Sequence, residues 1–350
     1  MEISWFAALC DDDYEVLGVP DPALTSSFEH CGDLVSEAER WGFDNILLPS
    51  GYALGIDAVA FAAAVAPSTE RIRLLVAVRA GEVWPPQLAR QLATLDHLLD
   101  GRLTVNLISS DLPGETLGSG PRYARTREVM GVLRALLDGD RADVSGAFYD
   151  LHLDPPRLGT VSGRCPPLYF GGLSDEARDV AAGEADVYLM WPDTEDRVAD
   201  LIGDMRRRAE AHGRTLRFGY RTHVVVRDTE SEARSAAAHL LSAIDDAGGE
   251  AIRARSLDAG SVGVARQSAL RDDADADGYV TRHLWTGIGR ARSGCGAAIV
   301  GDPGQVAATL GRYVELGIDA FILSGYPHLD ECRRVGRSVL PLLDHAPLGS

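Results

Sequence analysis

Short apolar runs alternate with longer stretches of helical pattern along most of the chain. This alternation is typical of repeated β/α units that build a parallel sheet. The apolar runs predict strands at Ile3–Leu9, Asn45–Pro49, Ile72–Val78, Leu103–Ile108, Leu168–Gly172, Asp186–Trp191, Arg217–Arg227 and Ala320–Ser324. Eight strands in regular alternation with helices predict an α/β fold, the (β/α)8 TIM barrel.

The intervening helical patterns predict helices near Ser27–Trp41, Ile56–Ala66, Pro86–Leu99, Tyr123–Leu137, Ser174–Ala182, Glu195–His212, Pro303–Leu316 and Leu329–Leu343. Two segments interrupt the repeat. Residues Asp143–Leu158 carry short strands around Gly146 and predict an inserted β-hairpin. Residues Asp246–Ala298 lie between the seventh and eighth strands, and connections of this length are most often functional or disordered. We expect a single domain over residues 1–350, with the insertion 246–298 as a lid over the active site.

The seventh predicted strand reads RFGYRTHVVVR. Side chains on a strand point alternately to two faces, so Arg221 and His223 share one face. Both lie among apolar residues, and a buried charge without a partner is costly, so Arg221 is expected to have an anionic partner. That partner is either a bound ligand or a carboxylate of the core. His223 is either an active-site residue or a satisfied core histidine.

Charge and composition narrow the possible functions. The net charge of −18 argues against nucleic acid and against an anionic membrane surface as partners, because both attract basic patches. All 34 basic residues are arginine, which excludes Schiff-base chemistry and the lysine of a P-loop. No apolar run approaches the roughly 20 residues that span a bilayer, and the N-terminus lacks the basic region of a signal peptide. The five cysteines form no CxxC pair, so we expect reduced thiols and a cytoplasmic location.

The active site of a TIM barrel lies at the carboxyl ends of its strands. Those ends carry Ser50, Asn106, Gly171 to Ser174, Trp191, Arg221, His223 and Tyr326. This set has no cluster of carboxylates or histidines with metal-ligand spacing, and the chain has no GxSxG elbow, so neither a metal site nor a serine triad is expected. The segment FGGLSD, with Gly172 and Ser174, is either a phosphate cradle at a helix start or an ordinary helix cap. Tyr123, beside Arg122, is a second candidate phosphate contact.

Several long blocks then point to one family. They read RFGYRTHVVVR, LWTGIGRARSGCGAAIVGD, GIDAFILSGYPHLDE, PPLYFGGLSD, ARQLATLDHLLDGRLTVNL and SVGVARQSAL. Together they resemble the FMNH2-dependent alkanesulfonate monooxygenases of the bacterial luciferase-like family, over nearly the whole chain. The resemblance implies a barrel that binds reduced FMN, uses O2 to oxygenate the carbon next to a sulfonate, and releases aldehyde and sulfite.

The resemblance also implies roles for individual residues. Arg221, His223 and Tyr326 match active-site positions, and Arg292 matches the arginine of a mobile lid. Asn106, Tyr123 and Ser174 match positions of the flavin site, and Trp191 is expected as a wall of that site. Either His223 or Tyr326 is expected to act as the acid or base. No complete GxGxxG follows a strand, so we expect reduced flavin to come from a separate NAD(P)H:flavin reductase. The family implies a homodimer or homotetramer.

The chain departs from the family at the predicted substrate mouth. SGYALGID has Tyr52 and Leu54 where the family has arginine and cysteine, GVPDP replaces an acidic pair, and the loop ISSDLPG is shorter. An organosulfonate is therefore the expected substrate, with its identity open. The alternatives are oxygenation of a bulkier substrate in secondary metabolism, an F420-dependent oxidoreductase, and a non-catalytic flavin-binding relative.

Overall fold

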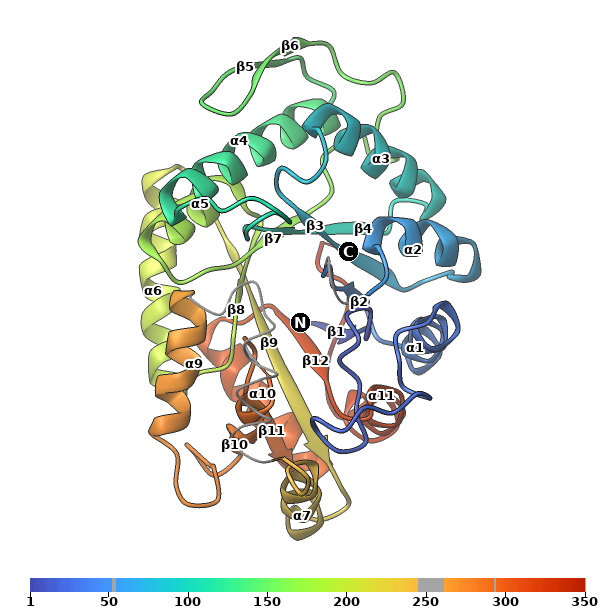
Figure 1. Cartoon of the computed structure of the whole chain (residues 1–350), viewed down its shortest axis with the longest axis vertical. Helices are drawn as coiled ribbons and strands as arrows, with labels where there is room; N and C mark the ends of the chain where they lie inside the picture. Colours follow the sequence, from blue (N-terminus) through green and yellow to red (C-terminus); the bar gives the residue numbers. More distant parts are fainter. Residues whose placement is uncertain (52–54, 245–260, 293, 350) are drawn as a thin grey trace.

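The computed structural model describes residues 1–51, 55–244, 261–292 and 294–349. Within these ranges, a closed barrel of eight parallel strands lies at the centre (Figure 1). The strands are β1 (Glu2–Phe6), β2 (Asn45–Leu48), β3 (Arg73–Arg79), β4 (Leu103–Ile108), β7 (Leu168–Phe170), β8 (Val187–Met190), β9 (Arg217–Val226) and β12 (Ala320–Ser324). Pairing of β8 with β9 closes the ring, which confirms the TIM barrel predicted from the sequence.

Helices cover the outside of the barrel. They are α1 (Phe28–Trp41), α2 (Ala58–Val65), α3 (Pro85–Leu98), α4 (Ser119–Leu137), α5 (Asp175–Glu184), α6 (Glu195–Ala211), α10 (Pro303–Leu316) and α11 (His328–Ser338), with short 3-10 turns at η1 (Ala66–Ser68) and η3 (Leu340–Leu342). Several of these helices begin at a polar N-cap residue, whose side chain accepts a backbone N–H of the first turn. The side chain of Ser27 accepts the N–H of His30 at the start of α1, and Asp302 forms a capping box with Gln305 at the start of α10.

Two layers of apolar side chains hold the barrel together. The larger layer lies between the strands and the helices, and the smaller one fills the barrel interior with Phe6, Leu47, Leu75, Ala77, Tyr169, Val187 and Ile322. Strands buried on both faces read as continuous apolar runs, which is why the sequence pattern located them. The predicted hairpin is confirmed as the antiparallel pair β5 (Ala142–Ser145) and β6 (Asp150–Leu153).

Strand β9 has ten residues and is the longest of the barrel strands, and along one edge it pairs with two strands in turn. Its first half pairs with β8 up to Tyr220, and its second half pairs with β11 (Ala298–Gly301) from His223 onward. Its other edge pairs with β12 throughout the middle. The neighbour of β9 on this edge therefore changes at Arg221 and Thr222 from the barrel strand β8 to β11.

The described part of the insertion contains α9 (Val262–Asp272), β10 (Leu284–Trp285), η2 (Gly287–Arg290) and β11, and α7 (Glu230–Leu240) precedes it. The sequence analysis ended the insertion at Ala298 and assigned no strand to the run after it. That assignment was wrong, because AIVG forms β11 and joins the sheet beside β9. Residues 246–260 of the predicted lid lie outside the described residues, as do Tyr52 and Leu54.

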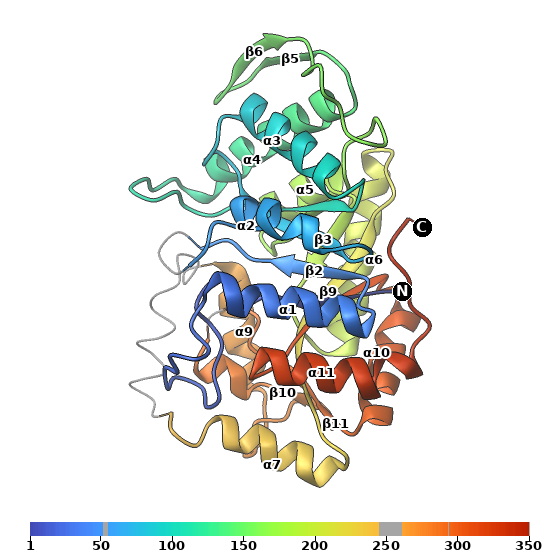
Figure 2. The same ribbon diagram turned by 90° about the vertical axis from the view of Figure 1, so that its right-hand side faces the viewer.

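The strands all point the same way, so their carboxyl ends gather on one side of the barrel. Figure 2 shows the long loops after β1 and β4 on that side and both chain termini on the opposite side. No helix in the described residues is long and apolar enough to cross a membrane.

Candidate active site

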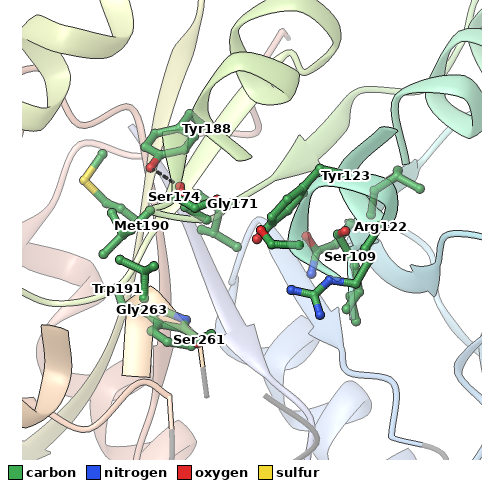
Figure 3. Close-up of a pocket in the computed structure, with 18 residues that line it drawn as sticks. Ser109, Arg122, Tyr123, Gly171, Ser174, Tyr188, Met190, Trp191, Ser261 and Gly263 are labelled. Carbon is green, nitrogen blue, oxygen red and sulfur yellow. Dashed lines mark hydrogen bonds between the residues drawn. The ribbon is translucent and has the colours of Figure 1, made fainter. Parts of the chain in front are cut away.

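A cavity of about 290 Å³ opens between the ends of β4, β7 and β8 (Figure 3). We call it the β4–β8 cavity. Its walls are Asn106, Leu107, Ile108, Ser109, Ser119, Arg122, Tyr123, Gly171, Gly172, Leu173, Ser174, Tyr188, Leu189, Met190, Trp191, Ser261, Val262 and Gly263. The structure therefore brings together all five residues for which the sequence predicted a flavin role: Asn106, Tyr123, Gly172, Ser174 and Trp191. Their assignment to flavin stays a prediction.

One end of this cavity has the features of an anion site. Ser174 caps α5 and accepts the N–H of Ala177 at 3.2 Å, and the positive end of the helix dipole faces the cavity there. A Cβ on Gly172 would lie 2.6 Å from the Cβ of Ala177 and 3.4 Å from the hydroxyl of Tyr123, so only glycine fits. The hydroxyl of Tyr188 donates to the carbonyl of Gly172 at 2.7 Å and fixes this turn.

Arg122 supplies a cation beside that helix start. Its Nη1 lies 3.2 Å from Asp111, and its guanidinium lies 5.5 Å from the centre of the Tyr123 ring. Its Nε is buried and has no hydrogen-bond partner among the residues that the structure describes. A free N–H, a helix N-terminus and a glycine turn together suit a phosphate group, so these residues fit the phosphate of a flavin mononucleotide.

The opposite wall is built from Trp191 and the insertion. A Cβ on Gly263 would lie 2.9 Å from the indole, and one on Gly294 would lie 3.2 Å from it, so both glycines pack directly on the ring. Figure 3 shows Arg122 and Tyr123 facing Trp191 and Gly263 across the cavity. In the sequence, SVGVARQSAL stood out only as a family block, and Gly263 was not predicted as a lining residue. Two glycines at a tryptophan wall are a long-range contact that no local pattern reveals.

A second group of side chains lies near the ring of Phe6. Two arginines lie over that ring, and a stacked histidine and tyrosine adjoin them. We call these four residues, Arg221, His223, Arg292 and Tyr326, the cation cluster. The guanidinium of Arg221 lies 4.4 Å from the Phe6 centroid and that of Arg292 lies 5.4 Å from it. These four residues are the catalytic candidates predicted from the sequence. They come from β9, the loop after β12 and the insertion, and they do not line the β4–β8 cavity itself.

Arg221 is 4% exposed, and no carboxylate lies within ion-pair distance of it in the described residues. Its Nη1 donates to the carbonyl of Thr222 at 2.8 Å, while its Nη2 has no partner among the described residues. Burial lowers the pKa of Arg221, yet a guanidinium stays protonated. The core carboxylate considered as a partner from the sequence is absent from the described residues. A bound anion as the partner of Arg221 stays a prediction.

Arg292 forms an ion pair with Asp12, and its Nη1 donates to the hydroxyl of Tyr326 at 3.0 Å. Burial acts to lower the pKa of Arg292, but Tyr326 and Asp12 outweigh burial and raise that pKa. Arg292 belongs to the insertion, and Asp12 to the loop after β1. The ion pair therefore ties the predicted lid to the barrel mouth, although the sequence analysis gave Asp12 no role.

His223 and Tyr326 stack with their ring centres 5.2 Å apart. His223 is fully buried, and Ser324 Oγ lies 2.7 Å from its Nδ1. Burial, together with Arg221 and Arg292, holds the pKa of His223 well below its usual range, so the imidazole is neutral near pH 7. Burial raises the pKa of Tyr326, so its phenol keeps its proton. The neutral imidazole can accept a proton, and the phenol can donate one.

The loop at Gly294 and Cys295 contacts both groups. Gly294 packs on Trp191 of the β4–β8 cavity, and the thiol of Cys295 donates to the carbonyl of Arg221 at 3.4 Å. Burial raises the pKa of Cys295, so the thiol is not a reactive thiolate. In the described residues, no group of three or more histidine, cysteine or acidic side chains could hold a metal ion.

Comparison with known proteins identifies the family. Residues 1–320 match the model of the luciferase-like monooxygenases. The chain belongs to this family. A sulfoquinovose monooxygenase of Novosphingobium aromaticivorans is 63% identical over 354 residues, covering 99% of this chain and 98% of the relative. A second one, of Agrobacterium fabrum, is 54% identical over 343 residues, covering 97% of this chain and 89% of the relative.

Solved structures of the luciferase-like fold superpose over almost the whole chain. EDTA monooxygenase from Chelativorans sp. BNC1 has a TM-score of 0.78 at 17% identity, covering 98% of this chain and 93% of its own. A long-chain alkane monooxygenase has a TM-score of 0.77 at 19% identity, covering 97% and 90%. An F420-dependent reductase of Methanopyrus kandleri, at 0.68 and 17%, shares the fold alone. The family and the close relatives confirm the prediction of a flavin-dependent monooxygenase over the F420 and non-catalytic alternatives.

Proposed function

We propose that this luciferase-like monooxygenase uses reduced FMN and O2 to oxygenate sulfoquinovose, and that sulfite and the sugar aldehyde are the products. The observation that carries the proposal is the buried guanidinium of Arg221, which has no carboxylate partner in the described residues. A sulfonate stays ionised at physiological pH, and a guanidinium offers it a permanent charge with a fork of donors. The names of the two close relatives supply the sugar.

The five predicted cofactor residues are assigned to FMN. Ser174, Gly172 and Tyr123, with Arg122, would hold the phosphate, while Asn106 and Trp191 would line the ring system. Bound reduced flavin supplies the electrons that activate O2. The helix start at α5 and the buried Nε of Arg122 support this placement.

The cation cluster is assigned to the substrate. Arg221 and Arg292 bind and orient the sulfonate, so that the adjacent carbon faces the oxidant. His223, which is neutral, accepts a proton, and Tyr326, which keeps its phenol proton, donates one. Closure of the insertion over this cluster would exclude water, because Arg292 already bridges the insertion to Asp12.

Further parts of the proposal concern the whole protein. Residues 1–350 act as a single domain with residues 246–298 as the lid. A separate NAD(P)H:flavin reductase supplies the reduced FMN, because the chain has no nicotinamide-binding fingerprint. The enzyme works in the cytoplasm as a homodimer or homotetramer.

The test is sulfite release from sulfoquinovose in the presence of a flavin reductase, NADH and FMN. We expect one sulfite for each O2 consumed beyond the background of reductase alone, and no sulfite without O2. Methanesulfonate and octanesulfonate serve as parallel substrates. Sulfite from an alkanesulfonate but not from sulfoquinovose would overturn the sugar assignment, and sulfite from neither would overturn the sulfonate assignment.

A further inference from the structure

The charges around the cation cluster do not cancel. The guanidiniums of Arg221 and Arg292 lie over the same Phe6 ring, 4.4 Å and 5.4 Å from its centre. Among the described residues, the one carboxylate that pairs with either of them is that of Asp12, which forms an ion pair with Arg292. Two positive charges and one negative charge leave an excess of one positive charge at this place.

The neighbouring polar side chains do not change this balance. Burial lowers the pKa of His223 and raises that of Tyr326, so both side chains are uncharged near pH 7. Asp13, the next carboxylate along the loop, is partnered by two histidines at 2.9 Å and 3.0 Å. Arg79, at the end of β3, has the carboxylate of Glu82 4.0 Å away. The excess charge is therefore set by the two guanidiniums and the one carboxylate beside Phe6.

Asp12 lies close enough to act on the place where an anion is proposed to bind. Burial lowers the pKa of Arg221, and Asp12 acts against that shift, so its negative charge is felt at both guanidiniums. Its Oδ1 is buried and has no hydrogen-bond partner in the part of the chain that the structure describes. Dissolved salt screens buried charges only weakly, so Asp12 also repels any further negative charge that enters the site.

A site with one excess positive charge distinguishes anions by their charge. The attraction of an anion to the site grows in proportion to its charge, whereas the cost of removing it from water grows with the square of that charge. A sulfonate carries one negative charge and neutralises the site. A phosphate monoester carries between about 1.5 and 2 negative charges at pH 7. It would leave an uncompensated negative charge buried beside Asp12, which is unfavourable.

We propose that Asp12 is a specificity-determining residue, whose carboxylate limits the site at the cation cluster to singly charged oxyanions and so excludes sugar phosphates. Asp12 acts through its charge and does not have to contact the substrate. Hexose phosphates carry hydroxyl groups as a sulfosugar does, so contacts with hydroxyl groups would separate the two classes poorly. This inference rests on the proposed function and concerns the selectivity of the same site.

The experiment compares glucose 6-sulfate with glucose 6-phosphate, two esters of nearly equal shape that differ in charge. Binding to the full-length enzyme loaded with oxidised FMN is measured by calorimetry near pH 7. We expect the wild type to bind the sulfate ester at least about tenfold more tightly than the phosphate ester. Hexyl sulfate and hexyl phosphate repeat the comparison without a sugar, and sulfite release from sulfoquinovose is measured in parallel.

Asp12→Asn removes the charge and keeps an oxygen that can accept from Arg292. It should strengthen binding of the phosphate ester relative to the sulfate ester by about tenfold to a hundredfold, the effect of one unit charge several ångströms away at a partly buried site. Asp12→Glu keeps the charge and should keep the preference. The matched control is Glu15→Gln, an exposed acid of the same loop, which should leave the ratio of the two esters unchanged.

Equal changes for both esters in Asp12→Asn would show that the residue only holds the insertion in place, and they would overturn the proposal. A wild type that binds both esters equally would overturn it as well. If Asp12→Asn does not fold, glucose 6-fluorophosphate is tested with the wild type, because it keeps the phosphate geometry but carries a single charge. It should bind as the sulfate ester does, and binding as weak as that of the phosphate would contradict the inference.

The parallel assay separates this inference from the proposed function. An intact preference for the singly charged esters, without sulfite from sulfoquinovose, would contradict the proposed function alone. Normal sulfite release with equal binding of the two esters would contradict the role of Asp12 alone. Failure of every ester to bind would remove the anion site on which both depend.

Discussion

The β4–β8 cavity and the cation cluster share one mouth of the barrel, yet they are built in different ways. The cavity is formed by strand ends, the glycine turn at Gly172 and the first turn of α5, so the main chain sets its shape. The cation cluster depends on side-chain contacts between distant segments. Asp12 and Arg292 are 280 positions apart in sequence. The wall of the cavity that carries Ser174 is therefore fixed once the barrel folds, and only the wall at Trp191 is completed by the insertion. In the cluster, by contrast, a guanidinium itself comes from the insertion.

The two regions also differ in charge balance. Two guanidiniums lie against Phe6, but only Arg292 has a carboxylate partner in the described residues. Arg292 lowers the pKa of Arg221 in addition to the larger effect of burial, which is the signature of like charges held close together. An anion bound between them would relieve this repulsion. The cluster thus has an excess of positive charge, which a bound anion would neutralise. In the cavity, the favourable place for an anion is the N-terminal end of helix α5.

Arg221→Met is expected to have the largest effect, and it should impair the cation cluster without affecting the β4–β8 cavity. We expect kcat/KM for sulfite release to fall about 30-fold to 5000-fold, equivalent to about 2–5 kcal/mol for a truncated buried charge partner. FMN affinity should stay within about twofold, because Arg221 does not line the cavity. Thermal unfolding should be unchanged or slightly higher, since an unpaired buried charge is removed.

The control for Arg221→Met is Arg217→Met, at the exposed first residue of the same strand. It should leave both kcat/KM and FMN affinity unchanged. Normal turnover in Arg221→Met, or a large loss of FMN affinity, would contradict the division of the mouth into two regions.

Arg292→Ala tests the link between the insertion and the barrel. It should raise KM more than it lowers kcat, with a total loss of about tenfold to a hundredfold in kcat/KM, because it removes one sulfonate contact and also leaves Asp12 unpaired. A double-mutant cycle with Asp12→Asn on the stability of the protein should give a coupling of about 0.5–3 kcal/mol. Additive effects would show that the ion pair does not hold the insertion.

Sequence reasoning located the cavity more completely than the cluster, for the same structural reason. Barrel strands read as buried apolar runs, and their carboxyl ends gather by topology, so Asn106, Ser174 and Trp191 followed from position along the chain. Strand alternation likewise placed Arg221 and His223 on one face. Position just past the last strand gave Tyr326, whereas Arg292 came only from the family resemblance.

The residues that sequence reasoning missed lie in loops or across the insertion. Asp12 and Asp13 belong to a run of three aspartates that resembles any solvated loop, and only their contacts with Arg292 and His328 distinguish them. The acidic stretch at 271–279 has the composition of a flexible loop, but the carboxylate of Asp275 accepts the N–H groups of Asp277 and Tyr279 and forms a tight turn. Side-chain contacts of this kind follow no sequence periodicity, so the pattern of residues along the chain does not predict them.

A substitution at the cavity should weaken FMN binding and leave sulfonate binding unchanged, which is the reverse of the result expected for Arg221→Met. Gly172→Ala places a Cβ 2.6 Å from Ala177 and strains a backbone φ of +150°, so the turn at the start of α5 must shift. We expect the dissociation constant of FMN, measured by fluorescence quenching, to rise about tenfold, the equivalent of one charge-assisted hydrogen bond. At saturating FMN, KM for the sulfonate should stay close to that of the wild type.

The matched control is Gly131→Ala in α4, where a Cβ meets no atom within 4 Å. It should bind FMN as the wild type does and should unfold at the same or a slightly higher temperature. If Gly172→Ala also binds FMN normally, the phosphate lies elsewhere.

The smallest expected effect concerns the stability of the loop after β1. Burial acts to raise the pKa of Asp13, but His328 and His30 outweigh burial and lower that pKa below its usual range. Its carboxylate therefore stabilises the fold above about pH 4, the value for an unfolded chain, and this stabilisation is lost as pH falls through the folded pKa. The hydrogen bond to Asp13 raises the pKa of His30. The stabilisation that this contact provides is therefore fully present below about pH 6.5, the value for an unfolded chain, and is lost as pH rises through the folded pKa of His30.

Asp13→Asn should consequently lower the free energy of unfolding by about 1–3 kcal/mol between roughly pH 4 and pH 6.5. The difference from the wild type should shrink as pH falls below about 4 and through the lowered folded pKa of Asp13. It should also shrink in part as pH rises above about 6.5 and through the raised folded pKa of His30, where the bonds to His328 remain. Urea denaturation across this range measures it, with Asp200→Asn on the exposed face of α6 as the control. A difference that does not vary with pH would mean that shape, rather than charge, makes Asp13 stabilising, and the loop would then resemble the cavity more than the cluster.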